Sequence, residues 1–369
     1  MTSTTTSICC LIPLYAHVRT FPRKFPFIQY FNKRISILLF LTYLLTSCNT
    51  MENQKYAWIA SPSAPEEYPM EIYKGALISE DYAYTFDSIW GIMNPGWGNA
   101  AGMMCAANYP AHLPHLLKMT WYSYIEKKYY TGSWEVDKNE ILKIIRTYLN
   151  HYPSEFEFRV GLGPEGLVSL WIYGDSQLLI GTYQAQETVL TPENTDESFE
   201  HHFRAPDRDI PSRIKAKVGD STYQKLMDNG WHKAVRYHQY NTKFDWKLKA
   251  NGLENFRISN SFFWSPNGEK ILSPVLQIND LPLPKPLPTL MYISYKDKQG
   301  QKWAAQATFD YDYLYNLISS ISNEEAFTFV YDIDMDNHQL KVYLEANEQK
   351  LALNTLENLI IKENMYGKR

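Results

Sequence analysis

Residues 128–149, KYYTGSWEVDKNEILKIIRTYL, decide the local fold because a strand, a helix cap and a helix follow one another there. The first nine residues are rich in aromatic side chains, which favours a strand. Asp137 is a good N-cap, and Glu140 three residues later is typical of a capping box. The apolar residues after this cap fall on one helical face: Ile141, Ile144, Ile145 and Leu149.

The chain on either side extends this stretch into a larger unit. A strand is expected to begin after Leu113-Pro114, because proline fits the start of a strand. After the helix, Gly163–Gly166 has turn chemistry between the apolar segments 156–162 and 167–173, which predicts a hairpin. The order strand–strand–helix–strand–strand, with antiparallel sheets and a packed helix, predicts the α+β class.

A second, similar unit is indicated by four pairs of segments at a nearly constant offset. The most extensive pair is Leu113–Ser123 with Leu287–Asp297. In the second unit Asp310 is the expected N-cap, and Leu314, Leu317, Ile318 and Ile321 form the apolar stripe. We therefore predict an internal repeat. The expected organisation is a signal peptide (1–47), a lipidated polar tether (48–67), a first α+β unit (68–190), a charged linker with one short helix, Ser221–Asn229 (191–242), and a second α+β unit (243–369).

The composition excludes several classes of protein. The chain has 369 residues, 36 of them basic and 40 acidic, and 45% hydrophobic residues. These values are ordinary for a globular protein and exclude a disordered tail, a collagen-like fibre and a multi-span membrane protein. The mild acidity argues against a nucleic-acid partner. The first 51 residues contain no acidic side chain, which is typical of a targeting segment.

The N-terminal segment is predicted to be an export signal with a lipid attachment site. Lys33-Arg34 precedes an apolar run, residues 35–45, which is too short to span a bilayer but suits a signal peptide. Leu45-Thr-Ser-Cys48 then resembles a bacterial lipobox, so Cys48 is expected to carry acyl chains such as palmitate. Asn49 after this cysteine favours the outer membrane. Translation from Met51 would instead give a cytoplasmic protein without an anchor.

Several motifs do not predict a cofactor or a metal. Gly174-Asp-Ser and Gly96-Trp-Gly lack the flanking residues of an esterase or a dinucleotide site. Residues 332–343 lack the glycine and glutamate of a calcium loop. Pro114 separates His112 from His115, which argues against one helix presenting both to zinc. We expect no cofactor and no metal, and interpret the lone Cys105 as a small buried hydrophobe.

One loop has the composition of a recognition site. Residues 90–98 read WGIMNPGWG, and we name Trp90, Asn94 and Trp97 as candidate ligand-binding residues because tryptophan leads binding hot spots. The alternative is a wide turn whose tryptophans cover the end of the sheet.

The same loop, the run Leu113–Tyr130 and the run Val160–Trp171 together resemble the bacterial lipoprotein family catalogued as domain of unknown function 2931 (DUF2931). Residues 181–185, GTYQA, fit that family as well. Glu165 stands where a second glycine is expected. The resemblance implies an envelope lipoprotein of Gram-negative bacteria and brings no catalytic residues.

Three functions stay open from the sequence. The first is a non-catalytic envelope lipoprotein that binds a protein partner. The second is a lipoprotein that binds a glycan or a peptide through exposed aromatic side chains. The third is a hydrolase whose carboxylates, such as Glu126 and Asp137, meet only in the folded chain.

Overall fold

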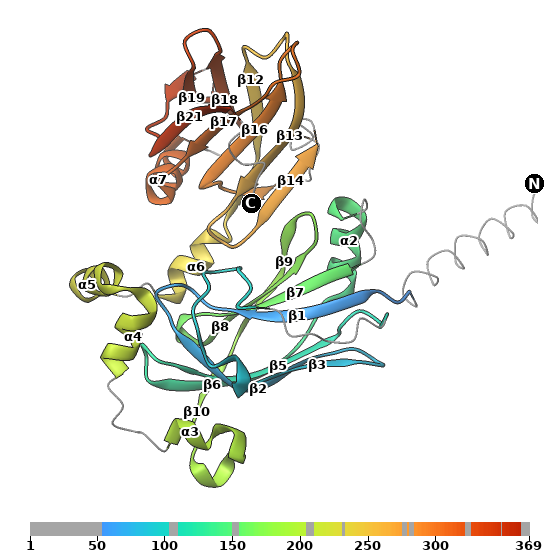
Figure 1. Ribbon diagram of the computed structural model, residues 1–369, viewed down its shortest axis with the longest axis vertical. Helices are drawn as coiled ribbons and strands as arrows, with labels where there is room; N and C mark the ends of the chain where they lie inside the picture. The colour runs from blue at the N-terminus through green and yellow to red at the C-terminus, as the bar shows by residue number, and fades with distance from the viewer. Residues whose placement is uncertain are drawn as a thin grey trace, which may run out of the picture. The chain divides into compact units, whose positions relative to one another are not determined.

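The computed structural model describes residues 54–102, 110–149, 155–203, 210–230, 233–274, 279, 284–321, 326–347 and 349–362. The chain divides into two compact units, Met1–Gln54 and Lys55–Arg369, and the second contains the fold (Figure 1). The expected signal peptide, Cys48 and Cys105 lie outside the described residues. None of the helices in the described part of the chain combines the length and apolarity needed to cross a bilayer.

The first half of the fold is built mainly from strands. Its strands are β1 (Ala57–Ser63), β2 (Met70–Ile78), β3 (Ala83–Asp87), β4 (Ile92–Met93), β5 (Leu116–Ser123), β6 (Lys128–Glu135), β7 (Glu155–Leu162), β8 (Leu167–Tyr173), β9 (Gln177–Gln184) and β10 (Gln186–Thr188). Its helices are η1 (Ser88–Trp90), α2 (Lys138–Tyr148) and η2 (Pro164–Gly166). One sheet has the order β10-β6-β5-β2-β3, with β4 on β2, and β1-β7-β8-β9 begin another.

The segment between the halves is helical. It contains η3 (Pro192–Asn194), η4 (Glu197–Phe199), α3 (Glu200–Phe203), α4 (Ile210–Val218), α5 (Asp220–Asn229) and α6 (Ala234–Tyr240). The predicted short helix is confirmed as α5, which ends at Gly230 with φ +82°. The prediction of only one helix is wrong. Single apolar side chains such as Ile214 and Tyr237 anchor α4 and α6, and such sparse anchors are hard to recognise in a charged stretch.

The described residues of the second half combine strands with one helix. Its elements are β11 (Lys243–Phe244), β12 (Trp246–Asn251), β13 (Arg257–Trp264), β14 (Lys270–Pro274), β15 (Lys285–Pro286), β16 (Leu290–Lys296), β17 (Lys302–Thr308), α7 (Tyr311–Ile321), β18 (Phe327–Asp334), β19 (Gln339–Ala346), β20 (Gln349–Ala352) and β21 (Glu357–Lys362). One pairing, between Lys270 of β14 and Gln177 of β9, joins the halves into a nine-stranded sheet. Its order is β1-β7-β8-β9-β14-β13-β16-β17-β21. The predicted α+β class is confirmed.

Both predicted helix caps are present. The Asp137 carboxylate accepts hydrogen bonds from the backbone N–H groups of Asn139 and Glu140, and Asp310 accepts one from Tyr313. The predicted stripe of α2 is buried, as are Leu314 and Ile318 of α7, while Leu317 and Ile321 are partly buried against the same core. Local sequence chemistry therefore accounts for where both helices begin and which face they bury.

The prediction that the sheets are antiparallel is wrong. The sheets are not purely antiparallel, because β1 pairs with β7 and β12 with β18 in parallel. A parallel pair requires a long crossover, here the whole stretch from β2 to α2 in the first half, which hairpin patterns do not indicate.

The predicted polar tether, residues 48–67, is longer than the structure allows. Residues 57–63 form β1, in which Trp58 packs edge-on against Phe158 with ring centroids 5.4 Å apart.

Candidate functional site

The loop of candidate ligand-binding residues is packed against the protein itself. The Trp97 ring lies edge-on to the rings of Trp171 and Tyr237, with centroids 5.0 Å away in each case. Gly161 of β7 makes room for it, since a Cβ there would lie 2.5 Å from the Trp171 ring and 3.0 Å from that of Trp97. Trp97 thus covers the sheet, as the alternative interpretation of this loop expected.

Asn94 and Trp90 also have structural surroundings. The Asn94 amide donates hydrogen bonds to the carbonyl oxygens of Glu66 at 2.8 Å and Lys217 at 3.3 Å, so it ties the loop to two other segments. Trp90 is partly buried against the core, and its indole N–H is buried without a hydrogen-bond partner among the described residues. Ligand binding by Trp90, Asn94 and Trp97 stays a prediction.

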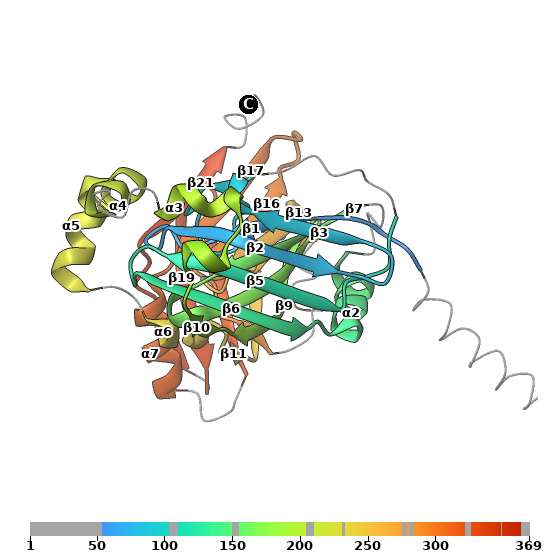
Figure 2. The ribbon, with the colours of Figure 1, turned by 90° about the horizontal axis from the view of Figure 1, so that it is seen from below.

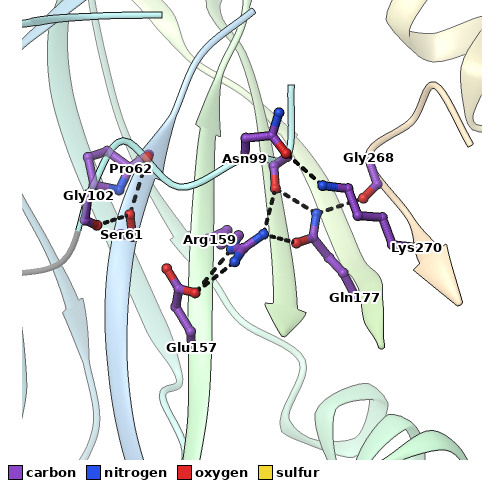
Figure 3. Close-up of polar contacts among 10 residues, drawn as sticks. Ser61, Pro62, Asn99, Gly102, Glu157, Arg159, Gln177, Gly268 and Lys270 are labelled. Atoms are coloured by element: carbon purple, nitrogen blue, oxygen red, sulfur yellow. Dashed lines mark hydrogen bonds and ion pairs between the residues drawn. The ribbon is translucent and has the colours of Figure 1, made fainter. Parts of the chain in front are cut away.

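A buried guanidinium holds the end of this loop on the sheet (Figure 3). Arg159 of β7 donates two hydrogen bonds to Glu157, at 2.9 and 3.2 Å, and one to the Gly98 carbonyl at 3.1 Å. It also donates to the Gln177 side-chain oxygen at 2.5 Å and lies 4.0 Å over the Tyr173 ring. The network satisfies a charge that would otherwise be costly to bury.

The same network connects the two halves. The Gln177 amide donates to Gly98 and, at 2.6 Å, to the carbonyl of Gly268 in the β13–β14 turn. Lys270 of β14 donates to the Asn99 side chain at 2.6 Å, as Figure 3 shows. The polar groups of this cluster face the protein interior or are paired with one another. We therefore interpret the cluster as a structural connection between the two halves.

An open hollow lies on the outward face of the β10-β6-β5-β2-β3 sheet. Strand register places two rows of short or polar side chains across this face. The first row is Gln186, Thr131, Thr120, Lys74 and Asp87. The second row is Ser133, Lys118, Ala76 and Thr85. Between them the strands carry inward-facing residues, including Gly75 and Gly132. The result is a hollow of about 920 Å³.

The other end of this face is covered by η4 and α3, which Figure 2 shows over the sheet. The His202 ring stacks on Phe199 at 4.7 Å and lies edge-on to Tyr122 of β5 at 4.6 Å. The carboxylate of Glu71 on β2 anchors this cover through both histidines, at 2.7 Å to His201 and 3.1 Å to His202.

The surroundings of Glu71 hold it in the charged form. Burial would raise its pKa, but hydrogen bonds from His202, His201 and Tyr124 outweigh burial and lower the pKa to about 2. The other ring nitrogen of His201 lies 3.2 Å from the Ser198 carbonyl, so each ring nitrogen has a hydrogen-bond partner. Among the described residues no group of three or more His, Cys, Asp or Glu side chains is arranged to hold a metal ion.

The proposed carboxylate pair of a hydrolase does not form. Glu126 lies in the turn before β6, where it accepts hydrogen bonds from Tyr130 and from the Glu165 backbone. Asp137 lies after β6, so the two are separated by the length of that strand, about 25 Å. Gly174-Asp-Ser is confirmed as a turn, between β8 and β9. Glu165 has φ +56°, consistent with the glycine expected there.

The comparison with family models matches residues 46–226 to "Protein of unknown function (DUF2931)". This part of the chain, slightly less than half of it, matches the DUF2931 family model. The resemblance inferred from the sequence is confirmed. No curated protein and no solved structure matches the chain. The hollow, the loop with Trp97 and the network around Arg159 all involve the DUF2931 region.

The sequence did not single out the hollow. Its outward residues alternate with buried ones along most of β5, which marks them as a solvent-facing side, whereas in β6 only Tyr130 is buried. Their alignment into rows requires the register between strands, and that register is a tertiary property.

Proposed function

We propose that this protein is a lipid-anchored, non-catalytic protein of the bacterial envelope that binds a protein partner through the hollow on the β10-β6-β5-β2-β3 sheet. The observation that carries the proposal is the pair of cross-strand rows of short or polar side chains in the DUF2931 region. Short side chains let the surface of a partner approach the sheet closely, and their hydroxyl groups supply hydrogen bonds.

The charges in the hollow favour a polar partner surface. Lys118 is exposed and has no ion-pair partner among the residues that the structure describes, while Lys74 donates to the Tyr73 hydroxyl at 3.1 Å. Asp87 lies opposite Lys74 at the edge of the sheet. Basic and acidic groups at different positions of one face favour a partner with complementary charges in a defined orientation.

Envelope location is supported by the sequence alone. The basic segment, the short apolar run and the Leu45-Thr-Ser-Cys48 site follow one another in the order of a lipoprotein signal. Metabolic labelling with a fatty-acid analogue should mark the wild-type chain and leave the Cys48→Ser variant unlabelled. Equal labelling of both would exclude Cys48 as the attachment site.

We also propose that the two halves are copies of one unit. The strand order β1-β7-β8-β9 corresponds to β12-β18-β19-β20, and β10-β6-β5-β2-β3 corresponds to β21-β17-β16-β13-β14. The parallel pairs β1–β7 and β12–β18 occupy equivalent places, as do α2 and α7. The outward faces of the two copies carry different side chains, and the hollow lies on that of the first.

The partner proposal can be tested by photo-crosslinking in growing cells. A photoreactive amino acid at position 120 should give a discrete adduct in the envelope fraction. The double variant Lys118→Glu, Ser133→Arg should abolish that adduct. The matched control, Gln339→Arg with Lys341→Glu on β19, makes the same changes at exposed positions of another sheet and should keep it. No adduct, or equal loss in both double variants, would refute the proposal.

Glycan binding is distinguished by a second measurement. Cell-wall glycan fragments should leave the melting temperature of the purified protein unchanged if the partner is a protein. A rise that depends on fragment concentration and disappears with the Lys118→Glu, Ser133→Arg variant would replace the protein partner by a glycan.

A further inference from the structure

The outward face of β14, β13, β16, β17 and β21 carries a mostly apolar row that is half-buried in the middle and exposed at both ends. Register places Leu272, Phe262, Tyr292, Gln306 and Leu359 side by side across these strands. Leu272 is 42% exposed and Leu359 39%, and the neighbouring Trp264 is 46% exposed. Five adjacent strands span about 19 Å between the outermost backbones. An exposed apolar face of this extent marks an interaction surface.

The rings on this face stand upright. Phe262 and Tyr292 stack on each other with centroids 4.5 Å apart and planes 19° from parallel. Trp264 follows at 6.0 Å from Phe262. Because the stacked rings cover each other's faces, they present their edges outward. This arrangement suits insertion into an apolar phase better than stacking on a sugar ring.

A row of cations lies farther along the same face. Register places Arg257, Lys296 and Lys302 side by side on β13, β16 and β17. None of the three forms an ion pair with any residue that the structure describes. Lys296 is four residues beyond Tyr292, so the cationic row lies about 13 Å from the apolar row.

The remaining charges on these strands leave the face positive. Lys270 donates to Asn99 and lies 5.3 Å over the Trp264 ring. Glu357 is the acidic side chain on this face, opposite Thr308 at the β21 edge. The face thus combines apolar side chains with an excess of basic groups.

We propose that this face docks on the surface of an anionic lipid bilayer. Tryptophan and tyrosine favour the boundary between headgroups and acyl chains, and lysine and arginine pair with lipid phosphates. A bilayer can accommodate a flat apolar row and a cationic row together. The inference is independent of the proposed partner site. Combined with an acyl anchor, a second contact would fix the orientation of the body on the membrane.

The test uses the chain from Asn49 onward, which lacks the attachment cysteine and contains the whole compact unit Lys55–Arg369. This protein should co-sediment with vesicles of phosphatidylglycerol and phosphatidylethanolamine at low salt. It should stay in the supernatant with phosphatidylcholine vesicles. Binding should weaken as salt is added, because surface charges are screened.

Two sets of variants locate the contact. Replacing Arg257, Lys296 and Lys302 by glutamine should weaken partitioning about 100-fold, since each cation contributes about fivefold near an anionic surface. The control replaces the exposed Lys247, Lys249 and Lys341, on β12 and β19, by glutamine and should change partitioning less than threefold. Leu272→Ser with Leu359→Ser should weaken partitioning about tenfold, and circular dichroism should show unchanged folding.

Three outcomes would overturn the proposal. The first is no binding of the folded protein to anionic vesicles. The second is equal loss in the two triple variants, which would indicate attraction by net charge alone. The third is vesicle binding that the two leucine substitutions do not affect. In the first case an acidic protein surface becomes the better match for this face.

Discussion

The buried pair Arg159–Glu157 allows a quantitative test of how the loop that contains Trp97 is held. We consider Arg159→Met, because the methionine side chain can still pack on Tyr173 while the charge is lost. The Gly98 carbonyl keeps the hydrogen bond from Gln177, so that acceptor stays satisfied. Glu157 loses both hydrogen bonds from the guanidinium, although its side chain is only 11% exposed.

The unpaired carboxylate of Glu157 determines how much the free energy of unfolding should fall. Removing one partner of a buried ion pair costs about 3–5 kcal/mol of unfolding free energy. Adding Glu157→Gln removes the stranded charge and should recover about half of that loss. The coupling between Arg159 and Glu157 in the double-mutant cycle equals this recovery plus the cost of Glu157→Gln alone, so it should be at least about 2 kcal/mol.

Urea unfolding followed by tryptophan fluorescence is a suitable assay, because Trp171 lies opposite Arg159 in the sheet and Trp97 packs against Trp171. Lys143→Met on the exposed side of α2 is the control, and it should change stability by less than about 0.5 kcal/mol. A loss below about 1 kcal/mol for Arg159→Met, or a coupling near zero, would refute the reasoning.

Three further predictions concern packing, capping and titration. Gly161→Ala should lower stability by about 1–3 kcal/mol, because its Cβ would collide with the Trp171 ring. Asp137→Ala should cost about 1 kcal/mol through loss of the α2 cap. Since the pKa of Glu71 is lowered from its ordinary value near 4.5 to about 2, its contribution of about 3 kcal/mol should be complete above pH 4.5 and lost as the pH falls to 2. Glu71→Gln should remove this pH dependence.

Each of these predictions has a direct check in denaturant unfolding. Gly230→Ala is a useful comparison for Gly161→Ala. Gly230 has a φ of +82° and nothing lies within 4 Å of an added Cβ, so this variant adds backbone strain without a steric clash. Asp137→Asn should retain most of the cap. An acid titration that is identical for wild type and Glu71→Gln would contradict the assignment of Glu71 as the anchor of η4 and α3.

The sequence was sufficient for features that depend on neighbouring residues. The caps at Asp137 and Asp310, the stripes of α2 and α7, and the stop of α5 at Gly230 follow from side chains within one or two turns. The turn at Gly163–Gly166 is equally local. These features could be predicted because their interactions require no knowledge of distant segments.

The tertiary structure alone decided what depends on pairing between remote segments. The parallel alignment of β1 with β7 joins residues almost 100 positions apart. Trp97 likewise packs against Tyr237 of α6, which lies far along the chain. The rows of Thr120 and of Phe262 exist only because register brings side chains of several strands into line. Alternation shows which residues face outward, but hydrogen bonding between strands determines which of them stand together.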